Sequence, residues 1–593
     1  MCGIVAGCSE KNLLNHLYQG LKNVEYRGYD SAGISFIQSS QIQTIKKVGK
    51  VNQLADCVEQ FEANVAIAHT RWATHGPVTE HNAHPHTSTQ YVSVVHNGII
   101  ENYLSIKNSL VKQGYPFASL TDSEVIPHLL HYYWQKTQSK SIALQKTIQQ
   151  LEGSFSIVAL FSDTPDQLFG ACQDSPLILG VGDTAHGLAS DALALTHWCK
   201  QSFTIPNRHI VLLKANTHEI QPFLGEAAQA LQPIENLTAM SHSKAGFDHY
   251  MLKEIHQQPG VWQSIISRYF EQANAIKWPN KPKHIHIIGC GSSFHAAQTA
   301  QYWFESVAKI PSMIHIASEY IDRSISVPDD CLLILPSQSG ETADTLSALK
   351  KAKSLNYTAT LALCNVMHSS LVQQTTYALP LMCGPEIGVA STKAFTAQLW
   401  LFFALANHWS DTTKLSLNHC QQMIHATQSL FTLSEQFQTL SQRLAHKKNV
   451  IFIGRELGYP TAMEAALKLK EISYIHAHAY PAGELKHGPL ALVDHDLPVI
   501  ASMIGSNIGH KMMNHLEEVQ ARHGDLIIFH QLSNADLKSR FPNASLLALP
   551  ACYPALSPML FSVAYQMAAY YIAKALDKPI DQPRNLAKSV TVE

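Results

Sequence analysis

The sequence predicts an α/β protein of several domains, and three observations carry that prediction. The chain has 593 residues, which is too long for one hydrophobic core, so about three or four domains of ordinary size are expected. Residues 1–240 alternate short β-rich runs with turns and few helical stretches. After residue 280, a strand–glycine–helix unit occurs and then recurs. We therefore expect an N-terminal α+β sandwich followed by two doubly wound, parallel-sheet α/β domains.

Composition narrows the class of protein and the kind of partner. Hydrophobic residues make up 46% of the chain and charged residues 15%, which is typical of globular packing. A net charge of −2 provides no field for nucleic acid or for anionic lipid, so small molecules are the expected partners. The eleven cysteines include no Cys-x-x-Cys, which argues against a disulfide framework and a thiolate zinc site. No secretory signal or membrane span is visible, and we expect a cytoplasmic protein.

The first 240 residues carry the pattern of a sandwich with few crossovers. Short apolar runs bounded by Gly, Pro or Asp predict strands at Val65–Ala68, Tyr91–Val95, Ser156–Phe161 and Leu177–Val181. Apolar residues spaced three and four apart predict helices at Lys11–Val24 and Ser123–Trp134.

The first four residues, Met1 to Ile4, suggest a nucleophile. If Met1 is removed, Cys2 carries a thiol and a free α-amine on the same carbon. The amine can accept the thiol proton and leave a reactive thiolate. Gly3 lets a substrate approach without a Cβ in the way. Most chains that begin Met-Cys give this cysteine no role, so the interpretation depends on the residues that follow.

Polar clusters that match such a nucleophile occur at 26–33, 69–76, 96–103 and 121–124. Arg71 could bind a carboxylate through two parallel hydrogen bonds, and Asp122 could bind an ammonium. Asn97 and the Gly98 N–H could stabilise an oxyanion. An α-amino acid whose side-chain carbonyl is attacked by Cys2 needs these three functions. Taken separately, Arg71 could form a surface ion pair, Asn97-Gly98 a hairpin turn and Asp122 a helix N-cap.

The histidines of the loop 80–86 raise the question of a metal. His81, His84 and His86 lack a carboxylate or cysteine set at a known ligand spacing. We expect no metal there.

The sequences of these clusters identify a family. Met-Cys-Gly-Ile, Tyr-Arg-Gly-Tyr-Asp-Ser-Ala-Gly, His-Thr-Arg-Trp-Ala-Thr-His-Gly and His-Asn-Gly-Ile-Ile-Glu-Asn-Tyr resemble the N-terminal-nucleophile glutamine amidotransferases, and most closely the glutamine–fructose-6-phosphate aminotransferases. The resemblance implies a four-layer sandwich in which Cys2 forms a glutamyl thioester and releases ammonia. It implies glutamine binding by Arg71, Trp72, Thr74, His75 and Asp122, an oxyanion site at Asn97 and Gly98, and an ammonia path gated by Trp72.

The repeat after residue 280 is visible without any family. Its paired segments are 284–293 with 449–455, 331–337 with 497–503, 358–363 with 525–529, and 377–381 with 544–549. Order and spacing are kept, so two copies of one domain are expected, with ligands at the carboxyl ends of the strands.

Three loops of the first copy suit a phosphosugar. Residues 290–293, 337–342 and 391–393 offer hydroxyls and N–H groups at predicted helix starts, although ordinary Ser and Thr capping would explain any one of them. The segment from Ser337 to Thr345 resembles the sugar isomerase domain. At the position of Ser292, that domain usually has a threonine. The resemblance implies sugar-phosphate contacts from Ser292, Ser293, Ser337, Gln338, Ser339, Thr342, Val389 and Ser391.

The second copy and the tail carry the proton chemistry. On the predicted helix 461–475, Lys468 and Glu471 share a face, and a carboxylate there could move the proton of a keto–aldo isomerisation. A salt bridge in the row Glu464, Lys468, Glu471 is the alternative. By resemblance, Glu471 is the isomerising base, Lys468 tunes it and His487 assists ring opening. The resemblance also implies that the tail 581–593 folds over the sugar site and that Lys588 forms an imine with the sugar, whereas the residues alone predict a surface strand.

Three segments depart from the family pattern: His478, Arg455-Glu456-Leu457, and the hydroxyls around Asp122 in 121–124. None of them removes a residue that has been given a role, so they bear on rate and regulation.

The resemblance covers the whole chain and divides it into parts. The glutaminase domain is expected at 1–240, the linker with the first helix at 241–280, the sugar isomerase domains at 281–425 and 445–580, and the tail at 581–593. The implied enzyme is a homodimer that needs no cofactor and makes glucosamine 6-phosphate and glutamate from fructose 6-phosphate and glutamine, with internal ammonia transfer, as the first step of amino-sugar biosynthesis. The alternatives are an amidotransferase or deglycase for another keto-sugar phosphate, or a phosphosugar-sensing regulator.

Overall fold

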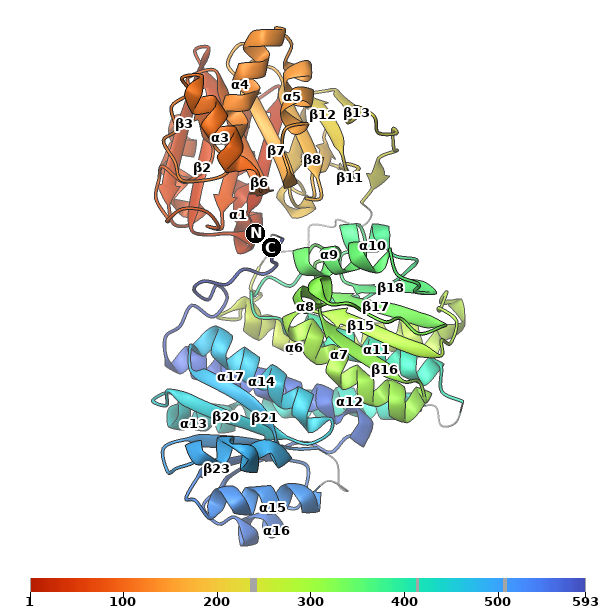
Figure 1. The fold of residues 1–593 in the computed structure, drawn as a ribbon. Coiled ribbons are helices and arrows are strands. Elements are labelled where there is room, and N and C mark those ends of the chain that lie inside the picture. Colours follow the sequence, from red (N-terminus) through yellow and green to blue (C-terminus); the bar gives the residue numbers. More distant parts are fainter. Residues whose placement is uncertain (1, 235–242, 412–414, 505–508, 592–593) are drawn as a thin grey trace.

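A computed structural model describes residues 2–234, 243–411, 415–504 and 509–591. Three sheet-containing bodies follow one another along the long axis of the molecule, and both ends of the chain lie where the first body meets the second (Figure 1). Met1, residues 235–242 of the predicted hinge and the last two residues of the predicted tail lie outside the described residues.

The first body is a sandwich of two antiparallel sheets with helices on both outer faces. The eight-stranded sheet has the order β14-β11-β9-β10-β1-β4-β2-β3 and the six-stranded sheet β13-β12-β8-β7-β6-β5. The strands of the larger sheet are β1 (Gly3–Ser9), β2 (Ser31–Gln38), β3 (Gln41–Val48), β4 (Val65–Arg71), β9 (Ile178–Val181), β10 (Ala185–Ala189), β11 (Gln201–Thr204) and β14 (Gln232–Pro233). Those of the smaller sheet are β5 (His86–Ser88), β6 (Val92–Ile100), β7 (Gly153–Phe161), β8 (Leu168–Gln173), β12 (His209–Leu213) and β13 (His218–Pro222).

Three apolar clusters make the layers of this body. Ile4 and Val158 belong to the cluster between the sheets. The larger sheet packs on its outer face against α1 (Leu14–Val24). The smaller sheet packs against α4 (Val125–Thr137) and α5 (Lys140–Ile148). The N-terminal part is therefore the four-layer sandwich that the family resemblance implied.

Two of the alternative roles considered for single residues of the polar clusters are wrong: the hairpin turn at Asn97-Gly98 and the helix N-cap at Asp122. Asn97 and Gly98 lie inside β6, paired with β7, and so do not form a hairpin turn. The helix predicted at 123–134 begins at Val125 with Glu124 at its N-cap, so Asp122 does not cap it.

The second and third bodies are parallel sheets of the same order, β16-β15-β17-β18-β19 and β21-β20-β22-β23-β24. The strands of the second body are β15 (His284–Gly289), β16 (Ser312–Ile316), β17 (Cys331–Ser337), β18 (Ala359–Cys364) and β19 (Tyr377–Pro380). Those of the third are β20 (Asn449–Gly454), β21 (His476–Pro481), β22 (Pro498–Met503), β23 (Asp525–His530) and β24 (Ser545–Ala548). The predicted repeat is confirmed, with one further strand in each copy, β16 and β21, that the pattern did not reveal.

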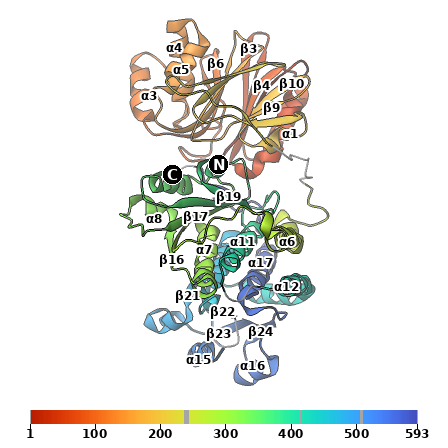
Figure 2. The same cartoon turned by 90° about the vertical axis from the view of Figure 1, so that its right-hand side faces the viewer.

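Helices cover both faces of each parallel sheet, and the inner ones share a core. The shared cluster joins α6 (Tyr250–Ile266), α7 (Gly291–Trp303), α11 (Lys393–His408), α14 (Gly458–Ser473) and α17 (Ser557–Ala575). Figure 2 shows α7, α11 and α17 between the two sheets. The outer faces carry α8 (Ala317–Asp322), α9 (Ala343–Ala352), α15 (Gly509–Gln520) and α16 (Asn534–Arg540). Because one core spans both sheets, helix α14 of the third body packs against the second body.

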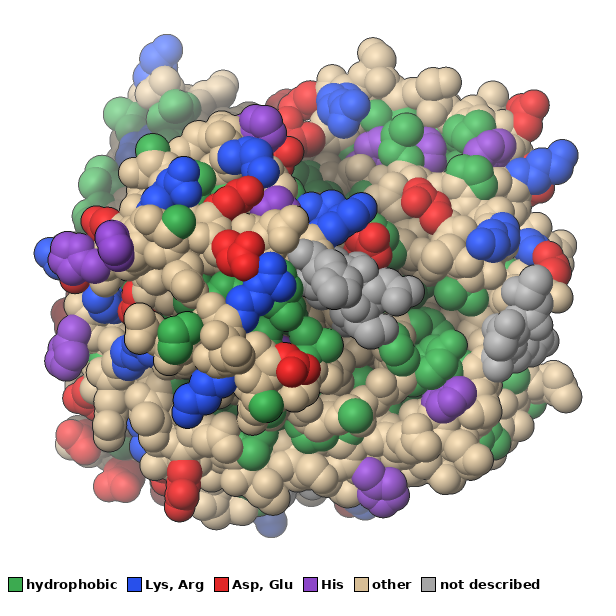
Figure 3. Space-filling model, turned by 90° about the horizontal axis from the view of Figure 1, so that it is seen from below, with side chains coloured by type: hydrophobic (Ala, Val, Ile, Leu, Met, Phe, Trp, Pro, Cys, Tyr) green, Lys and Arg blue, Asp and Glu red, His purple; other side chains and the backbone are tan. Residues whose placement is uncertain are grey.

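The surface of the third body, seen from below in Figure 3, carries acidic, basic and histidine side chains interspersed with one another. Within the described part of the chain, no helix has the length and apolarity needed to cross a bilayer.

Candidate active sites

Cys2 lies where the two sheets of the first body meet and contacts the loop that follows β4. The Trp72 N–H donates to its Sγ at 3.2 Å, and Asn97 Nδ2 donates to its carbonyl oxygen at 3.1 Å. Burial raises the pKa of the Cys2 thiol. A group that removes the thiol proton is therefore required before the sulfur can attack.

The predicted oxyanion donors, Asn97 and Gly98, are held in place by neighbouring residues on other strands. His69 Nε2 lies 3.0 Å from both Asn97 Oδ1 and the His96 carbonyl. Burial lowers the pKa of His69 to about 3, so its imidazole is neutral. Gly98 has φ +126°, and a Cβ there would lie 1.9 Å from the Ser154 carbonyl oxygen, so only glycine fits. Strand pairing thus sets the position of the donors beside Cys2.

The residues predicted to hold the amino and carboxyl groups of glutamine come together on one side of Cys2. Arg71 is 3% exposed and its guanidinium donates to the carbonyls of His75 (2.5 Å), Gly76 (3.3 Å) and Pro77 (3.4 Å), so the surface ion-pair interpretation is wrong. Asp122 Oδ2 accepts the Ile100 N–H at 2.8 Å.

The remaining residues of this set lie on the same loop. Asp122 Oδ1 lies 3.9 Å from His75 Nδ1. Trp72 and Thr74 lie on that loop, which the Ala73 N–H anchors to Asp30 at 2.8 Å.

The second site is a cavity of about 170 Å³ at the carboxyl edge of the sheet of the second body. Every residue predicted to contact the sugar phosphate lines it, together with Lys468, Glu471 and Lys588. Pro336 and Gln398 also line it and were not expected, whereas Cys290, Thr345, Leu586 and Ala587 come from segments expected there but had been given no contact. The three hydroxyl-bearing loops therefore converge, which capping alone does not explain.

Helix α14 contributes a row of charges to the wall of this cavity. The fully buried Lys468 Nζ lies 2.6 Å from Glu471 Oε2 and 3.4 Å from Glu464 Oε1. Burial would lower the pKa of Lys468, but the two glutamates raise it, so the amine stays charged. Glu464 also binds Ser292 Oγ and His295 Nδ1, each at 2.8 Å. The salt-bridge row exists, and it places Glu471 at the cavity.

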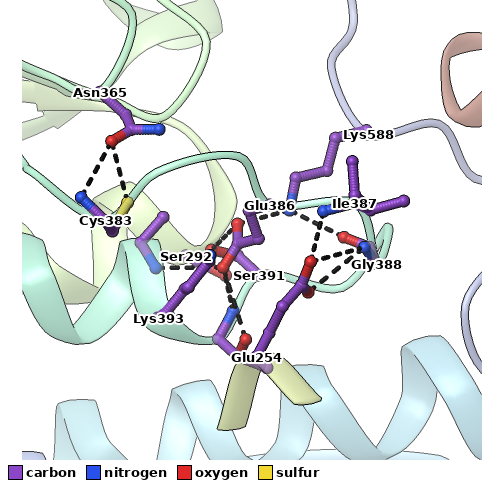
Figure 4. A network of polar contacts seen from close by, with 12 residues as sticks. Glu254, Ser292, Asn365, Cys383, Glu386, Ile387, Gly388, Ser391, Lys393 and Lys588 are labelled. Atoms are coloured by element: carbon purple, nitrogen blue, oxygen red, sulfur yellow. Dashed lines mark hydrogen bonds and ion pairs between the residues drawn. The ribbon is translucent and has the colours of Figure 1, made fainter. Parts of the chain in front are cut away.

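The tail 581–591 is neither frayed nor a surface strand. Lys588 Nζ lies 2.5 Å from Glu386 Oε2 and donates to the Gly388 carbonyl at 2.8 Å (Figure 4). The Tyr29 hydroxyl donates to the tail carbonyls of Pro583 (2.8 Å) and Leu586 (2.5 Å). The tail therefore connects the loop after α1 with the wall of the sugar cavity.

Tail residues also contact the predicted phosphate loop. Ser589 Oγ lies 2.8 Å from Ser339 Oγ, and the Ala343 N–H at the start of α9 donates to the Val590 carbonyl at 2.9 Å.

Glu386 was not singled out from the sequence, and Tyr29 was included in the cluster 26–33 without being given a role. Neither belongs to a pattern that marks chemistry, because each acts through a contact that joins segments far apart in sequence.

His487 is the one predicted catalytic residue that the described chain does not bring to a site. It is exposed at the end of the 3₁₀ segment Ala482–His487 and does not line the cavity.

Of the departures from the family pattern, the hydroxyls around Asp122 border the first site, where Ser123 Oγ donates to Asp122 Oδ1 at 3.4 Å, and the other two line neither site. His478 is exposed and contacts the ring of Tyr480, while Arg455 bonds His515 Nε2 at 3.0 Å. Glu456 adopts a positive φ of 46°, which a glycine would adopt with less strain. No group of three or more His, Cys, Asp or Glu in the described ranges has the geometry of a metal site.

Comparisons with known proteins agree with this arrangement. A family model described as a glutamine amidotransferase domain matches residues 69–197, and one described as a SIS domain matches residues 280–408 and 443–574. Proteins of Legionella pneumophila (strain Paris) and Pseudomonas aeruginosa, both named glutamine–fructose-6-phosphate aminotransferase [isomerizing], are 41% and 40% identical to this chain, each over the full length of both proteins.

A solved structure is similar to the two parallel-sheet bodies. It is the C-terminal domain of glucosamine-fructose-6-phosphate aminotransferase from Francisella tularensis, with 40% identity and a TM-score of 0.52. The match covers 57% of this chain and 100% of that one. The chain belongs to the glutamine–fructose-6-phosphate aminotransferase (isomerising) family.

Proposed function

We propose that this chain converts L-glutamine and fructose 6-phosphate into glutamate and glucosamine 6-phosphate. One observation carries the proposal: the tail that supplies Lys588 to the hydroxyl-lined cavity also contacts Tyr29, on the loop that leads to Asp30 and the Cys2 site. The names of full-length relatives state the same pair of substrates.

At the first site, removal of Met1 gives Cys2 a free α-amine that takes the thiol proton. The thiolate attacks the side-chain carbonyl carbon of glutamine, and the oxyanion is stabilised by Asn97 Nδ2 and the Gly98 N–H. Collapse expels ammonia and leaves a glutamyl thioester, which water cleaves to glutamate. Arg71 and Asp122 hold the α-carboxylate and α-ammonium, with Trp72, Thr74 and His75 completing the pocket.

At the second site, the hydroxyls of the three loops bind the phosphate and orient the sugar. Lys588 forms an imine with C2 of the open-chain ketose, and ammonia displaces the lysine. Glu471 then removes a proton at C1 and returns one at C2, with Lys468 holding its carboxylate in place. No cofactor or metal takes part in this scheme.

We further propose that the enzyme is a homodimer and that the chain divides at the boundaries predicted above. His487 is exposed and does not line the cavity of its own chain. A second copy could present its own His487 to the sugar, which would complete the site.

The test is a product assay on the purified chain with glutamine and fructose 6-phosphate. Glutamate and glucosamine 6-phosphate should form in equal amounts. Glutamate without amino sugar would leave the first site standing and favour a different keto-sugar phosphate as acceptor. Binding of sugar phosphate with neither product would favour the sensing regulator.

A further inference from the structure

Two carboxylates and two ammonium groups form a buried network behind the sugar cavity (Figure 4). They are Glu254 on α6, Glu386 in the loop before α11, Lys393 at the start of α11, and Lys588 in the tail. Glu254, Glu386 and Lys393 are at most 3% exposed, and the Lys588 side chain is 3% exposed. Buried charges at this density are rare unless they are paired or functional.

The two oxygens of Glu386 have different partners. Oε1 accepts the N–H groups of Thr392 (2.9 Å) and Ala394 (3.0 Å), which fixes the carboxylate at the N-terminus of α11. Oε2 faces Lys588 Nζ at 2.5 Å and accepts from Ser391 Oγ at 3.2 Å. One oxygen is thus an anchor, and the other is shared by an amine and a hydroxyl.

Both groups that share Oε2 also line the sugar cavity. Lys588 and Ser391 are wall residues of the cavity, whereas Glu386 lies behind them. The path from Lys588 Nζ through Glu386 Oε2 to Ser391 Oγ therefore begins and ends where the sugar would lie. Such a path can take a proton from the cavity wall at one point and return it at another.

The neighbouring carboxylate, Glu254, is held differently. Its oxygens accept the backbone N–H groups of Ile387 (2.5 Å) and Gly388 (3.3 Å). Burial and the charge of Glu386 raise the pKa of Glu254 to about 8. Burial would also raise the pKa of Glu386, but the Lys588 ammonium and the hydrogen bonds lower it, and the ammonium's share of that lowering ends when the proton leaves Lys588. At neutral pH the negative charge of the pair resides on Glu386, the carboxylate next to the amine.

We infer that Glu386 is the base that takes the proton from Lys588 for imine formation and returns it through Ser391 to the departing hydroxyl. The inference rests on the proposed role of Lys588. An ammonium has no lone pair, so Lys588 cannot attack a carbonyl until Glu386 Oε2 holds its proton.

The step balances in atoms and charge. The free Lys588 amine attacks C2 of the ketose, the C–N bond forms and the carbonyl π bond breaks. One amine proton moves to the new alkoxide and gives a neutral carbinolamine. Glu386 then protonates that hydroxyl through Ser391, water leaves, and a protonated C=N is formed. The step starts with an ammonium and a carboxylate and ends with an iminium and a carboxylate, plus water.

Borohydride trapping tests the assignment. Purified chain saturated with fructose 6-phosphate is reduced with borohydride, and the secondary amine on Lys588 is quantified by peptide mass. We expect Glu386→Gln to slow adduct formation by about 100-fold or more, the usual effect of removing an acid–base group. The matched control is Glu254→Gln, which alters the same network beside backbone N–H groups and should trap within a few-fold of wild type.

Two further readouts separate chemistry from structural damage. Glutamine hydrolysis at the Cys2 site and equilibrium sugar binding should be unchanged in Glu386→Gln. If that variant does not fold, Ser391→Ala at saturating sugar should trap about 10-fold more slowly, and Ser391→Thr should restore the rate.

The opposite result would overturn the inference. If Glu386 only stores Lys588 as an ammonium, its removal frees the amine, and Glu386→Gln traps as fast as wild type or faster. A wild-type enzyme that binds the sugar and yields no adduct would instead refute the imine at Lys588, and the role of Glu386 with it.

Discussion

The two sites of this chain handle charge in opposite ways. Around Cys2, the contacts are made by a backbone N–H and an amide side chain, and the buried charges of Arg71 and Asp122 bind backbone groups. Around the sugar cavity, ion pairs involving Lys468 and Lys588 are held out of water. The first site depends on one covalent nucleophile positioned by strand pairing, and the second on fixed charges positioned by helix ends. A mutation at one site should therefore leave the activity of the other site unchanged.

The largest effect is expected at the first site. Cys2→Ala should lower glutamine hydrolysis on the order of 10⁴-fold or more, because no other group can form the thioester. Sugar-phosphate binding, measured by calorimetry, should remain. Cys199→Ala, a half-buried cysteine of the same domain, is the control and should keep both activities. Normal glutamine use by Cys2→Ala would refute the first half of the account.

The matching mutation at the second site should cause a smaller loss of activity, and it should affect amino-sugar formation instead of glutamine hydrolysis. Glu471→Gln should slow amino-sugar formation from fructose 6-phosphate and ammonia by about 10²–10⁴-fold, since it removes the base and leaves the cavity shape. Glutamine hydrolysis should be unaffected. Lys470→Gln, exposed on the same helix, is the control. Equal losses at both sites would show that the sites are not separable.

The contact between the sites should have a modest effect on both. Tyr29→Phe removes the hydroxyl that binds Pro583 and Leu586. The single O–H is shared by both carbonyls and counts as one hydrogen bond of about 0.5–1.5 kcal/mol, so the tail should loosen by about 2- to 10-fold. The ratio of glutamate to amino sugar should rise above one, while Tyr91→Phe, a 41% exposed tyrosine, should leave it at one. An unchanged ratio would mean that the tail contact does not couple the sites.

The smallest expected effect is on stability and involves Glu341, in the phosphate loop. Burial raises the pKa of Glu341 to about 7, from an ordinary value of 4.5. Between about pH 4.5 and pH 7, Glu341 is protonated more fully in the folded chain than in the unfolded chain. Its contribution to the free energy of unfolding therefore falls as the pH rises through this range.

The variant Glu341→Gln mimics the neutral acid and tests this pH dependence. Its Tm relative to wild type should therefore be higher at pH 8 than at pH 5, by about 2–4 °C. Glu152→Gln, an exposed residue, should show no such pH dependence. The same Tm difference for Glu341→Gln at both pH values would contradict the assignment.

The sequence predicted local patterns and the repeat well, but not contacts between distant segments. Strand–glycine–helix spacing located both parallel sheets, because that pattern lies within a few residues. It missed the edge strands β16 and β21. Glu386 gave no signal, because its meaning depends on Lys588, which lies 202 positions away in the chain. His487 matched a family motif, yet only the structure shows that it is exposed and does not line the cavity of its own chain.

The most direct test of the central claim is the fate of the nitrogen. The claim is that the two sites, although chemically different, are joined by the tail so that ammonia passes inside the protein. The purified chain is supplied with fructose 6-phosphate, glutamine labelled with ¹⁵N in its amide, and an excess of unlabelled ammonium. We predict that the amino sugar carries ¹⁵N almost completely. Dilution of the label in proportion to the external ammonium would contradict the claim.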